Sequence, residues 1–190
     1  MLSPRFEVAL TYAGVIHAHQ QRKGTGIPYL AHLLGVASIA LEYGATEDEA
    51  IAALLHDAGE DAGGSGRIDD IRLRLGDPVA DIVQGCTDTV VTPKPPWRKR
   101  KEDYIAHLAF ASPSTLLVSA ADKVHNARAI VRDLRSSGDD LWTRFSGGRE
   151  SVWYYRSLVT AFRAAGSNEL VDELDRVVSE MEQLSGETSA

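Results

Sequence analysis

Four side chains that can bind a metal ion or transfer a proton follow closely on an apolar run at residues 51–55. They are His56, Asp57, Glu60 and Asp61. Residues four apart share one face of a helix, so His56 would stack with Glu60 and Asp57 with Asp61. Unpaired charges are costly to bury, and so many acidic groups at the end of an apolar segment indicate that a divalent cation offsets them. For Glu60 and Asp61 the alternative is an acidic, solvated helix end.

Two further polar residues sit in comparable apolar surroundings. His32 is the only charged or ring-nitrogen side chain in the apolar segment 30–37, and Asp122 follows the apolar run 116–121. A lone histidine on such a helix is more often a hydrogen-bonded core residue than a ligand. With His56 and Asp57, however, these residues make two imidazoles and two carboxylates on three apolar segments. This mixed set suits Mn²⁺ or Fe²⁺, with Zn²⁺ possible, and the single cysteine excludes a site built from thiolates.

The elements that must position these side chains are helices. Helical periodicity recurs along the whole sequence, whereas alternating runs rich in β-branched residues are scarce and short, so we expect an all-α fold. The expected helices cover residues 4–21, 29–43, 46–56, 69–75, 78–86, 97–108, 114–134, 149–165 and 168–184. Glycine and proline punctuate the loops between them, including residues 24–28 and 62–68. We expect one domain over residues 1–184 and a frayed tail at 185–190.

Composition narrows the possible functions. A chain of 190 residues that is 44% hydrophobic can bury one core. Its formal net charge of −7 argues against a general nucleic-acid binder or a membrane-surface protein, and favours a small ligand. The single cysteine allows no intrachain disulfide, no apolar signal core follows the first residues, and no apolar run approaches the roughly 20 residues of a membrane span. We therefore expect a cytoplasmic protein.

Four short motifs, in order, give the sequence a family resemblance. It resembles the HD-domain phosphohydrolases, whose ligands follow the order H…HD…D, and within them the hydrolase domain of the RelA/SpoT family and its stand-alone small alarmone hydrolases. The motifs are His17-x-x-Gln20-x-Arg22-Lys23-Gly24, Pro28-Tyr29-x-x-His32, Leu54-Leu55-His56-Asp57-x-x-Glu60-Asp61 and Ala121-Asp122-Lys123-x-His125-Asn126. An HD dipeptide alone is common, but the four motifs in sequence are specific.

The resemblance implies a fold, a metal and a set of site residues. The fold would be an HD-domain helical bundle. One Mn²⁺ would be bound by His32, His56, Asp57 and Asp122. The residues beside the catalytic water would be Glu60 and Asp61, and those contacting a guanine nucleotide would be Arg22, Lys23 and Asn126. Gly59 stands where related proteins often have an apolar residue, so the helix is expected to bend just before Glu60.

Further nucleotide contacts are expected from two basic or aromatic stretches. The run at residues 98–101 could clamp distal phosphates, although Arg98 and Lys99 could equally form a solvated basic face. The resemblance favours Arg100 and Lys101 in this run. In related hydrolases a tyrosine and an arginine from a late helix approach the nucleotide, which makes Tyr155 and Arg156 candidates.

These expectations combine into a reaction. A divalent ion lowers the pKa of its water and polarises a phosphoryl oxygen, and a nearby carboxylate can move the proton. By resemblance, the reaction is removal of the 3′-diphosphate of guanosine tetra- or pentaphosphate, (p)ppGpp, to give GDP or GTP and pyrophosphate. Two alternatives stay open: an HD-domain phosphohydrolase acting on another nucleotide such as NADPH or a dNTP, and a nucleotide sensor without catalysis.

Overall fold

The protein was analysed as a computed structural model that describes residues 1–61, 63–89, 91 and 93–186, apart from the side chain of Asp61. Within these residues every regular element is a helix, and a single isolated antiparallel bridge joins Gln21 to Pro28. The expectation of an all-α fold is therefore confirmed. No helix in this described part is both long enough and apolar enough to cross a bilayer. The chain forms two compact units, each described separately below.

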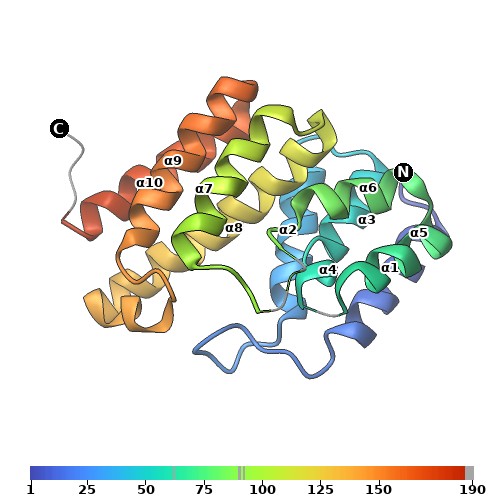
Figure 1. Cartoon of the computed structure of the whole chain (residues 1–190), viewed down its shortest axis with the longest axis horizontal. Helices are drawn as coiled ribbons and strands as arrows, with labels where there is room; N and C mark the ends of the chain where they lie inside the picture. Colours follow the sequence, from blue (N-terminus) through green and yellow to red (C-terminus); the bar gives the residue numbers. More distant parts are fainter. Residues whose placement is uncertain (62, 90, 92, 187–190) are drawn as a thin grey trace. The chain divides into compact units, whose positions relative to one another are not determined.

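The first unit comprises residues 1–95 and 111–121. Its helices are α1 (Pro4–Ile16), α2 (Leu30–Glu42), α3 (Glu47–Leu55), α4 (Ala58–Asp61), α5 (Gly64–Leu75), α6 (Asp77–Cys86) and the first part of α8 (Pro113–Ser137). The helix α3 is the centre of this unit and packs against α1, α2 and α6 (Figure 1). Its residues from Ala50 to Leu55 are fully buried, which agrees with their uninterrupted apolar character. The candidate site therefore begins at the end of the most buried helix of this unit.

Capping explains where α3 starts. The Thr46 hydroxyl accepts a hydrogen bond from the Glu49 backbone N–H, and the Glu49 carboxylate accepts one from the Thr46 N–H at 2.7 Å. This reciprocal capping box satisfies backbone donors that the first helical turn leaves unpaired. Three acidic residues in the first turn, Glu47, Asp48 and Glu49, also complement the positive end of the helix dipole. Local sequence therefore fixes the start of the helix that leads to His56.

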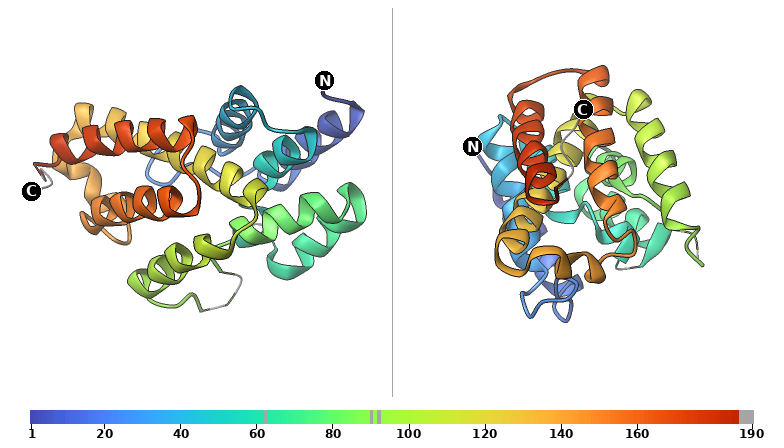
Figure 2. Two further views of the ribbon diagram at one scale, coloured as in Figure 1. Left: turned by 90° about the horizontal axis from the view of Figure 1, so that it is seen from above. Right: turned by 90° about the vertical axis from the view of Figure 1, so that its left-hand side faces the viewer.

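The second unit comprises residues 96–110 and 122–190, described as far as residue 186. It contains α7 (Trp97–His107), η1 (Leu108–Phe110), the remainder of α8, η2 (Gly138–Arg144), α9 (Glu150–Ala165) and α10 (Glu169–Leu184). The helices α9 and α10 lie side by side (Figures 1 and 2). Apolar residues of α10, including Leu174 and Val178, are fully buried.

Two helix boundaries differ clearly from the sequence-based expectation. The first helix ends at Ile16 rather than near residue 21, because residues 20–29 close on themselves through backbone hydrogen bonds. Residues 64–68 were expected to be a loop because of their glycines, but they form the first turn of α5. Burial of Ile68, Ile71 and Leu75 along one face of α5 explains this, since tertiary packing overrides the weak helix propensity of glycine.

The expected tail is only partly described. Ser185 is buried, and its carbonyl oxygen accepts a hydrogen bond of 2.6 Å from the Arg149 guanidinium. The helix α10 ends at Leu184, and residues 187–190 lie outside the described residues. The prediction of one domain over residues 1–184 stays a prediction.

Candidate metal centre

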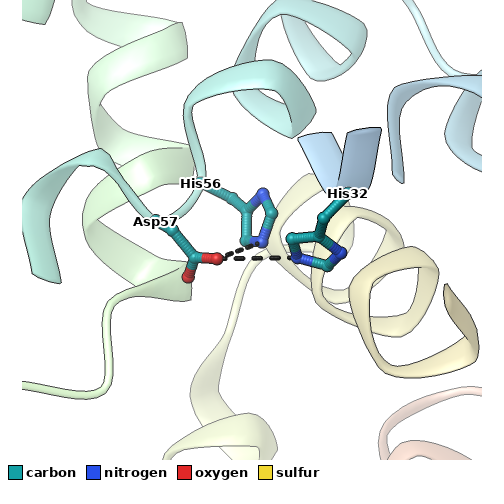
Figure 3. Close-up of side chains that lie close together, drawn as sticks. All are labelled: His32, His56 and Asp57. Carbon is teal, nitrogen blue, oxygen red and sulfur yellow. Dashed lines mark ion pairs between the residues drawn. The ribbon is translucent and has the colours of Figure 1, made fainter. Parts of the chain in front are cut away.

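Three of the four predicted metal ligands lie together in the first unit. His32 comes from α2, and His56 and Asp57 from the turn that follows α3 (Figure 3). One ligand atom from each residue lies within 4.8 Å of the others. The Asp57 Oδ2 is 2.9 Å from the His56 Nε2 and 3.6 Å from the His32 Nε2. The two imidazoles are almost fully buried, at 1% and 3% exposure, so the donor atoms converge in a space largely closed to bulk water.

The packing of α2 against α3 brings these residues together. The His32 and His56 rings meet edge to face with their centroids 5.2 Å apart. The His56 Nδ1 lies 2.8 Å from the carbonyl oxygen of Ala53, which cannot donate, so Nδ1 carries the proton of the neutral ring. This leaves the Nε2 lone pair directed toward Asp57, and a backbone contact of this kind is the usual way a ligating histidine is oriented.

The donor set fits a divalent metal ion. Ligand bonds of about 2.0–2.2 Å to nitrogen and oxygen place neighbouring donors about 3–3.5 Å apart, and the two donor separations at Asp57 bracket this range. Two neutral nitrogens and one carboxylate oxygen suit a borderline or hard first-row ion. The carboxylate, 23% exposed, also supplies the negative charge that a cation would neutralise. His32, His56 and Asp57 are therefore the residues that would hold the ion.

Tyr29 contacts this group from the start of α2. Its hydroxyl donates a hydrogen bond to the Asp57 Oδ2, and its ring lies 5.3 Å from that of His32. Sequence reasoning quoted Tyr29 only as part of a motif and gave it no role. Its spacing of three residues before His32, one helical turn, is the signal that could have placed it beside a ligand.

Glu60 and Asp61 follow after a break in the helix. The helix α3 ends at Leu55 and the short α4 begins at Ala58, so the continuous helical stacking expected for residues 56–61 is interrupted at His56 and Asp57. The Glu60 carboxylate accepts a hydrogen bond of 2.7 Å from the Lys94 ammonium group. Lys94 was missed because it lies in a proline-rich linker without periodicity. The side chain of Asp61 lies outside the described residues.

Gly59 lies in a tightly packed position. A Cβ atom at this position would lie 3.0 Å from the Thr87 Oγ1 and 3.1 Å from the Ile68 Cδ1, closer than ordinary contact. A side chain at this position would require the Thr87 and Ile68 side chains to shift by a few tenths of an ångström. The position that departs from the family pattern is thus matched to its own surroundings.

Asp122, the fourth predicted ligand, belongs to the second unit and is described there. It is buried, and its two carboxylate oxygens accept hydrogen bonds of 2.6 Å from the Lys123 ammonium group and 2.6 Å from the Asn126 amide. Burial alone would lower the pKa of Lys123, but the Asp122 carboxylate and, next, Tyr104 raise it well above its ordinary value. Lys123 is therefore a largely enclosed cation, with 14% of its side chain exposed. The only sequence signal for this role of Lys123 was its position directly after the predicted ligand Asp122.

The basic run on α7 is partly neutralised by its own neighbours. Arg98 pairs with Glu102 one turn away and with Glu150, and its guanidinium lies over the Trp153 ring, 3.2 Å from the centroid. Lys99 pairs with Asp103, also one turn away. The sequence left open whether these two residues form a solvated basic face, and their contacts agree with that alternative. Of the two residues favoured as phosphate ligands, Lys101 lies over the Tyr154 ring at 5.0 Å, and Arg100 is half-buried.

The two candidates on α9 are largely engaged within the second unit. Tyr155 is buried at 7% exposure, beside the Tyr154 ring. The Arg156 guanidinium donates to the Glu182 carboxylate through Nε at 2.8 Å and through a second nitrogen at 2.5 Å, and also contacts Asp175 and the Ser179 hydroxyl. These contacts join α9 to α10. That Tyr155 and Arg156 contact a nucleotide stays a prediction.

Arg22 and Lys23 occupy a closed loop in the first unit. The Arg22 N–H donates to the Ile27 carbonyl at 2.9 Å, and its own carbonyl accepts from the Thr25 N–H at 3.0 Å. Gly24 has φ of +71°, in the left-handed region that favours glycine at a tight turn. Lys23 is exposed and Arg22 half-buried, so this loop presents two cations at the surface of the unit.

The chain is similar to known proteins in both sequence and structure. Residues 9–153 match the family model described as HD domain. Guanosine-3′,5′-bis(diphosphate) 3′-pyrophosphohydrolase MESH1 of Xenopus tropicalis is 36% identical over 138 residues, which cover 71% of this chain and 72% of that protein. The Homo sapiens protein of the same name is 35% identical over 138 residues, with the same coverage.

A solved structure is similar over nearly the whole chain. It is described as "A metazoan ortholog of SpoT hydrolyzes ppGpp and plays a role in starvation responses" and superposes with a TM-score of 0.78. It is 28% identical, and the match covers 98% of each chain. The likeness therefore extends beyond the residues of the motifs to the fold that positions them.

Proposed function

The chain belongs to the HD-domain family, and from that membership we propose that it is a metal-dependent hydrolase of (p)ppGpp. It removes the 3′-diphosphate of guanosine tetra- or pentaphosphate and yields GDP or GTP and pyrophosphate. The observation that carries this proposal is the buried convergence of His32, His56 and Asp57, in a chain that resembles ppGpp hydrolases along most of its length. Two imidazoles and a carboxylate whose potential ligand atoms converge on one point are the arrangement that a bound divalent ion requires.

The metal site is proposed to take Mn²⁺, with Fe²⁺ or Zn²⁺ as the other ions that suit the donors. His32, His56 and Asp57 would hold it, and the family resemblance supplies Asp122 as the fourth ligand. When bound, such an ion lowers the pKa of a water molecule and polarises a phosphoryl oxygen. The oriented Nε2 of His56 and the hydrogen bond from Tyr29 to Asp57 support this assignment, because both leave lone pairs directed at one position.

The proton transfers are assigned to Glu60 and Asp61. A carboxylate close to the reacting centre can accept a proton from the attacking water or return one to the leaving oxygen, and this contribution is typically roughly 10²–10⁴-fold. Glu60 follows Asp57 by three residues and is partly buried, at 21% side-chain exposure. The Lys94 ammonium group contacts the Glu60 carboxylate directly and restricts its orientation.

The substrate is held by cations in a protein of net negative charge. Arg22 and Lys23 can pair with phosphates, and Arg22 can also stack on a base through its flat guanidinium. The remaining proposed contacts come from Asn126, Arg100, Lys101, Tyr155 and Arg156.

The proposed location of the protein is the cytoplasm. A guanine nucleotide substrate and an acidic overall charge are both compatible with this location.

The decisive experiment is a turnover assay on metal-free protein supplied with Mn²⁺ and ppGpp. We expect stoichiometric release of pyrophosphate and GDP, and no release from Asp57→Ala under the same conditions. A parallel panel of NADPH, a dNTP and a nucleoside monophosphate tests the alternative substrates of HD-domain hydrolases. Preference for one of these over ppGpp would replace the proposed substrate, and tight ppGpp binding without turnover would instead identify a nucleotide sensor.

A further inference from the structure

We propose that Tyr29 is a positioning residue that connects the loop carrying Arg22 and Lys23 to the metal ligand Asp57. Ordering of this loop and binding of a divalent cation then strengthen each other. The inference rests on the proposed function for the identity of the cation. It goes beyond that function because it gives Tyr29 a role and couples the Arg22–Lys23 loop to the metal ligand Asp57.

The side chain of Tyr29 acts directly on the ligand. Its hydroxyl donates to Oδ2 of Asp57, the oxygen that also faces the His32 and His56 nitrogens. A carboxylate can rotate about its terminal bond, and a donor on one oxygen restricts that rotation. The Tyr29 ring is itself fixed, because it packs against His32 at 5.3 Å and against His17 at 5.4 Å. The phenol therefore holds the carboxylate from a constrained position.

The backbone of Tyr29 joins the loop to the helix that carries His32. Its N–H donates to the Gln20 carbonyl at 2.9 Å, and its carbonyl accepts from the His32 N–H at 2.9 Å. The bridge between Gln21 and Pro28 closes the loop next to this point. A displacement of the loop end at Gln20 is thus transmitted to the residue that orients Asp57.

His17 supports Tyr29 from the other side. It is buried at 2% exposure, and its Nδ1 lies 2.6 Å from the Gln20 side-chain oxygen. Within the described residues its Nε2 is buried without a hydrogen-bond partner. An unsatisfied buried nitrogen is costly, and the contacts of the ring with Tyr29 and Gln20 offset part of that cost. His17 therefore braces both the loop end and the Tyr29 ring.

The coupling has a thermodynamic consequence. If the metal-binding orientation of Asp57 and the closed loop share Tyr29, binding of the cation favours the closed loop, and closure favours binding by the same factor. Coupling between sites is typically about 5- to 150-fold. Loss of a residue that orients a metal ligand typically weakens metal affinity about 10- to 100-fold.

The test uses the full chain in its metal-free form, with Mn²⁺ as the probe and no nucleotide. Calorimetric titration measures Mn²⁺ affinity, and limited trypsin digestion followed by mass spectrometry measures cleavage after Arg22 and Lys23. In the wild-type protein we expect saturating Mn²⁺ to slow this cleavage about fivefold or more. In Tyr29→Phe we expect affinity to fall about tenfold or more, and protection at saturating Mn²⁺ to be lost.

Tyr12→Phe is the matched control. Tyr12 also donates its hydroxyl to an aspartate of the first unit, Asp70, away from the predicted ligands. Its removal should leave Mn²⁺ affinity and loop protection unchanged. Equal Mn²⁺ affinity of Tyr29→Phe and wild type, equal losses in both variants, or no effect of Mn²⁺ on wild-type cleavage would each overturn the proposal. A protein that binds Mn²⁺ without hydrolysing ppGpp would refute the proposed function alone, whereas absence of Mn²⁺ binding would overturn both.

Discussion

The Nδ1 of His56 lies 2.8 Å from the carbonyl oxygen of Ala53, one turn earlier in the same chain segment. The helix that delivers this histidine thus also determines which of its nitrogens faces Asp57. Because α3 is fully buried from Ala50 to Leu55, the orienting carbonyl belongs to one of the most tightly packed parts of the first unit. The orientation of the His56 ring is therefore set by the packed core rather than by a loop.

Replacement of His56 should remove metal binding. His56→Ala deletes an oriented ligand, and we expect Mn²⁺ affinity to fall by more than the roughly 100-fold seen for residues that only orient a ligand. Calorimetric titration of metal-free protein measures the change. His107→Ala, which alters an exposed histidine of α7, should bind Mn²⁺ like the wild type. Retained affinity in His56→Ala would contradict the ligand assignment.

Replacement of Glu60 should separate catalysis from metal binding. Glu60→Gln keeps the shape of the side chain but cannot accept a proton, so we expect kcat for ppGpp to fall roughly 10²–10⁴-fold. Mn²⁺ affinity should stay within about twofold of the wild type. Lys94→Met removes the partner of Glu60 in a partly exposed pair, and such pairs contribute about 1 kcal/mol or less, so kcat should change less than about fivefold. An equal loss in both variants would assign the effect to the ion pair instead.

Arg156 should contribute to folding through its contacts with α10. Hydrogen bonds to Glu182, and then to Asp175, raise the pKa of the Arg156 guanidinium above its ordinary value, which reflects a stabilised charge. Arg156→Lys cannot reproduce the two-nitrogen contact with Glu182, and we expect a loss of about 1–3 kcal/mol in the free energy of unfolding in urea.

The same variant tests the role of Arg156 in substrate binding. A loss of stability with unchanged KM for ppGpp would indicate a structural residue, and a raised KM with unchanged stability would indicate a nucleotide contact. Arg163→Lys, on the same helix but about half exposed, is the matched control and should change stability by less than about 1 kcal/mol.

The capping box of α3 should make stability depend on pH. Burial alone would raise the pKa of Glu49, but hydrogen bonds from Thr46 and Ser114 lower it below its ordinary value of 4.5. The unfolded chain therefore binds this proton more readily than the folded one. The stabilising contribution is complete above the unfolded pKa and is lost as the pH falls through the lower, folded pKa.

Glu49→Gln tests this sign directly. The variant should show a smaller decrease in the free energy of unfolding as the pH falls below about 4.5 than the wild type does. Urea unfolding at a series of pH values measures the difference, and Glu7→Gln on the exposed face of α1 serves as control. If the free energy of unfolding depends on pH equally in Glu49→Gln and in the wild type, other carboxyl groups dominate this dependence.

The sequence was sufficient to predict the all-α fold and the order of the main helices. The apolar run before His56 indicated a buried helix in an otherwise helical sequence, and Thr46 with Glu49 signalled its start. The sequence also allows prediction of the ion pairs Arg98–Glu102 and Lys99–Asp103, because a spacing of four residues places the two members of each pair on one helix face.

Other features depend on contacts between distant residues and could not be read from the sequence. One such feature is the break between α3 and α4, and another is the close approach of Gly59 to Ile68 and Thr87. Neither can be predicted unless the packing of α5 and α6 is known. The spacing of Tyr29 to His32 could have placed it beside a ligand, but its hydrogen bond to Asp57, 28 residues away, could not be read from the sequence. The glycines at 64 and 66 led to the prediction of a loop, but the burial of Ile68 favours a helix there.

The short backbone bridge between Gln21 and Pro28 has an evolutionary consequence. Backbone hydrogen bonds fix both ends of the segment between these two residues. Its composition and length can therefore vary while its ends keep their positions. Exchange of residues 22–27 could give a descendant enzyme a new nucleotide preference, but an exchange that moves the loop end at Gln20 would also alter ion binding through Tyr29.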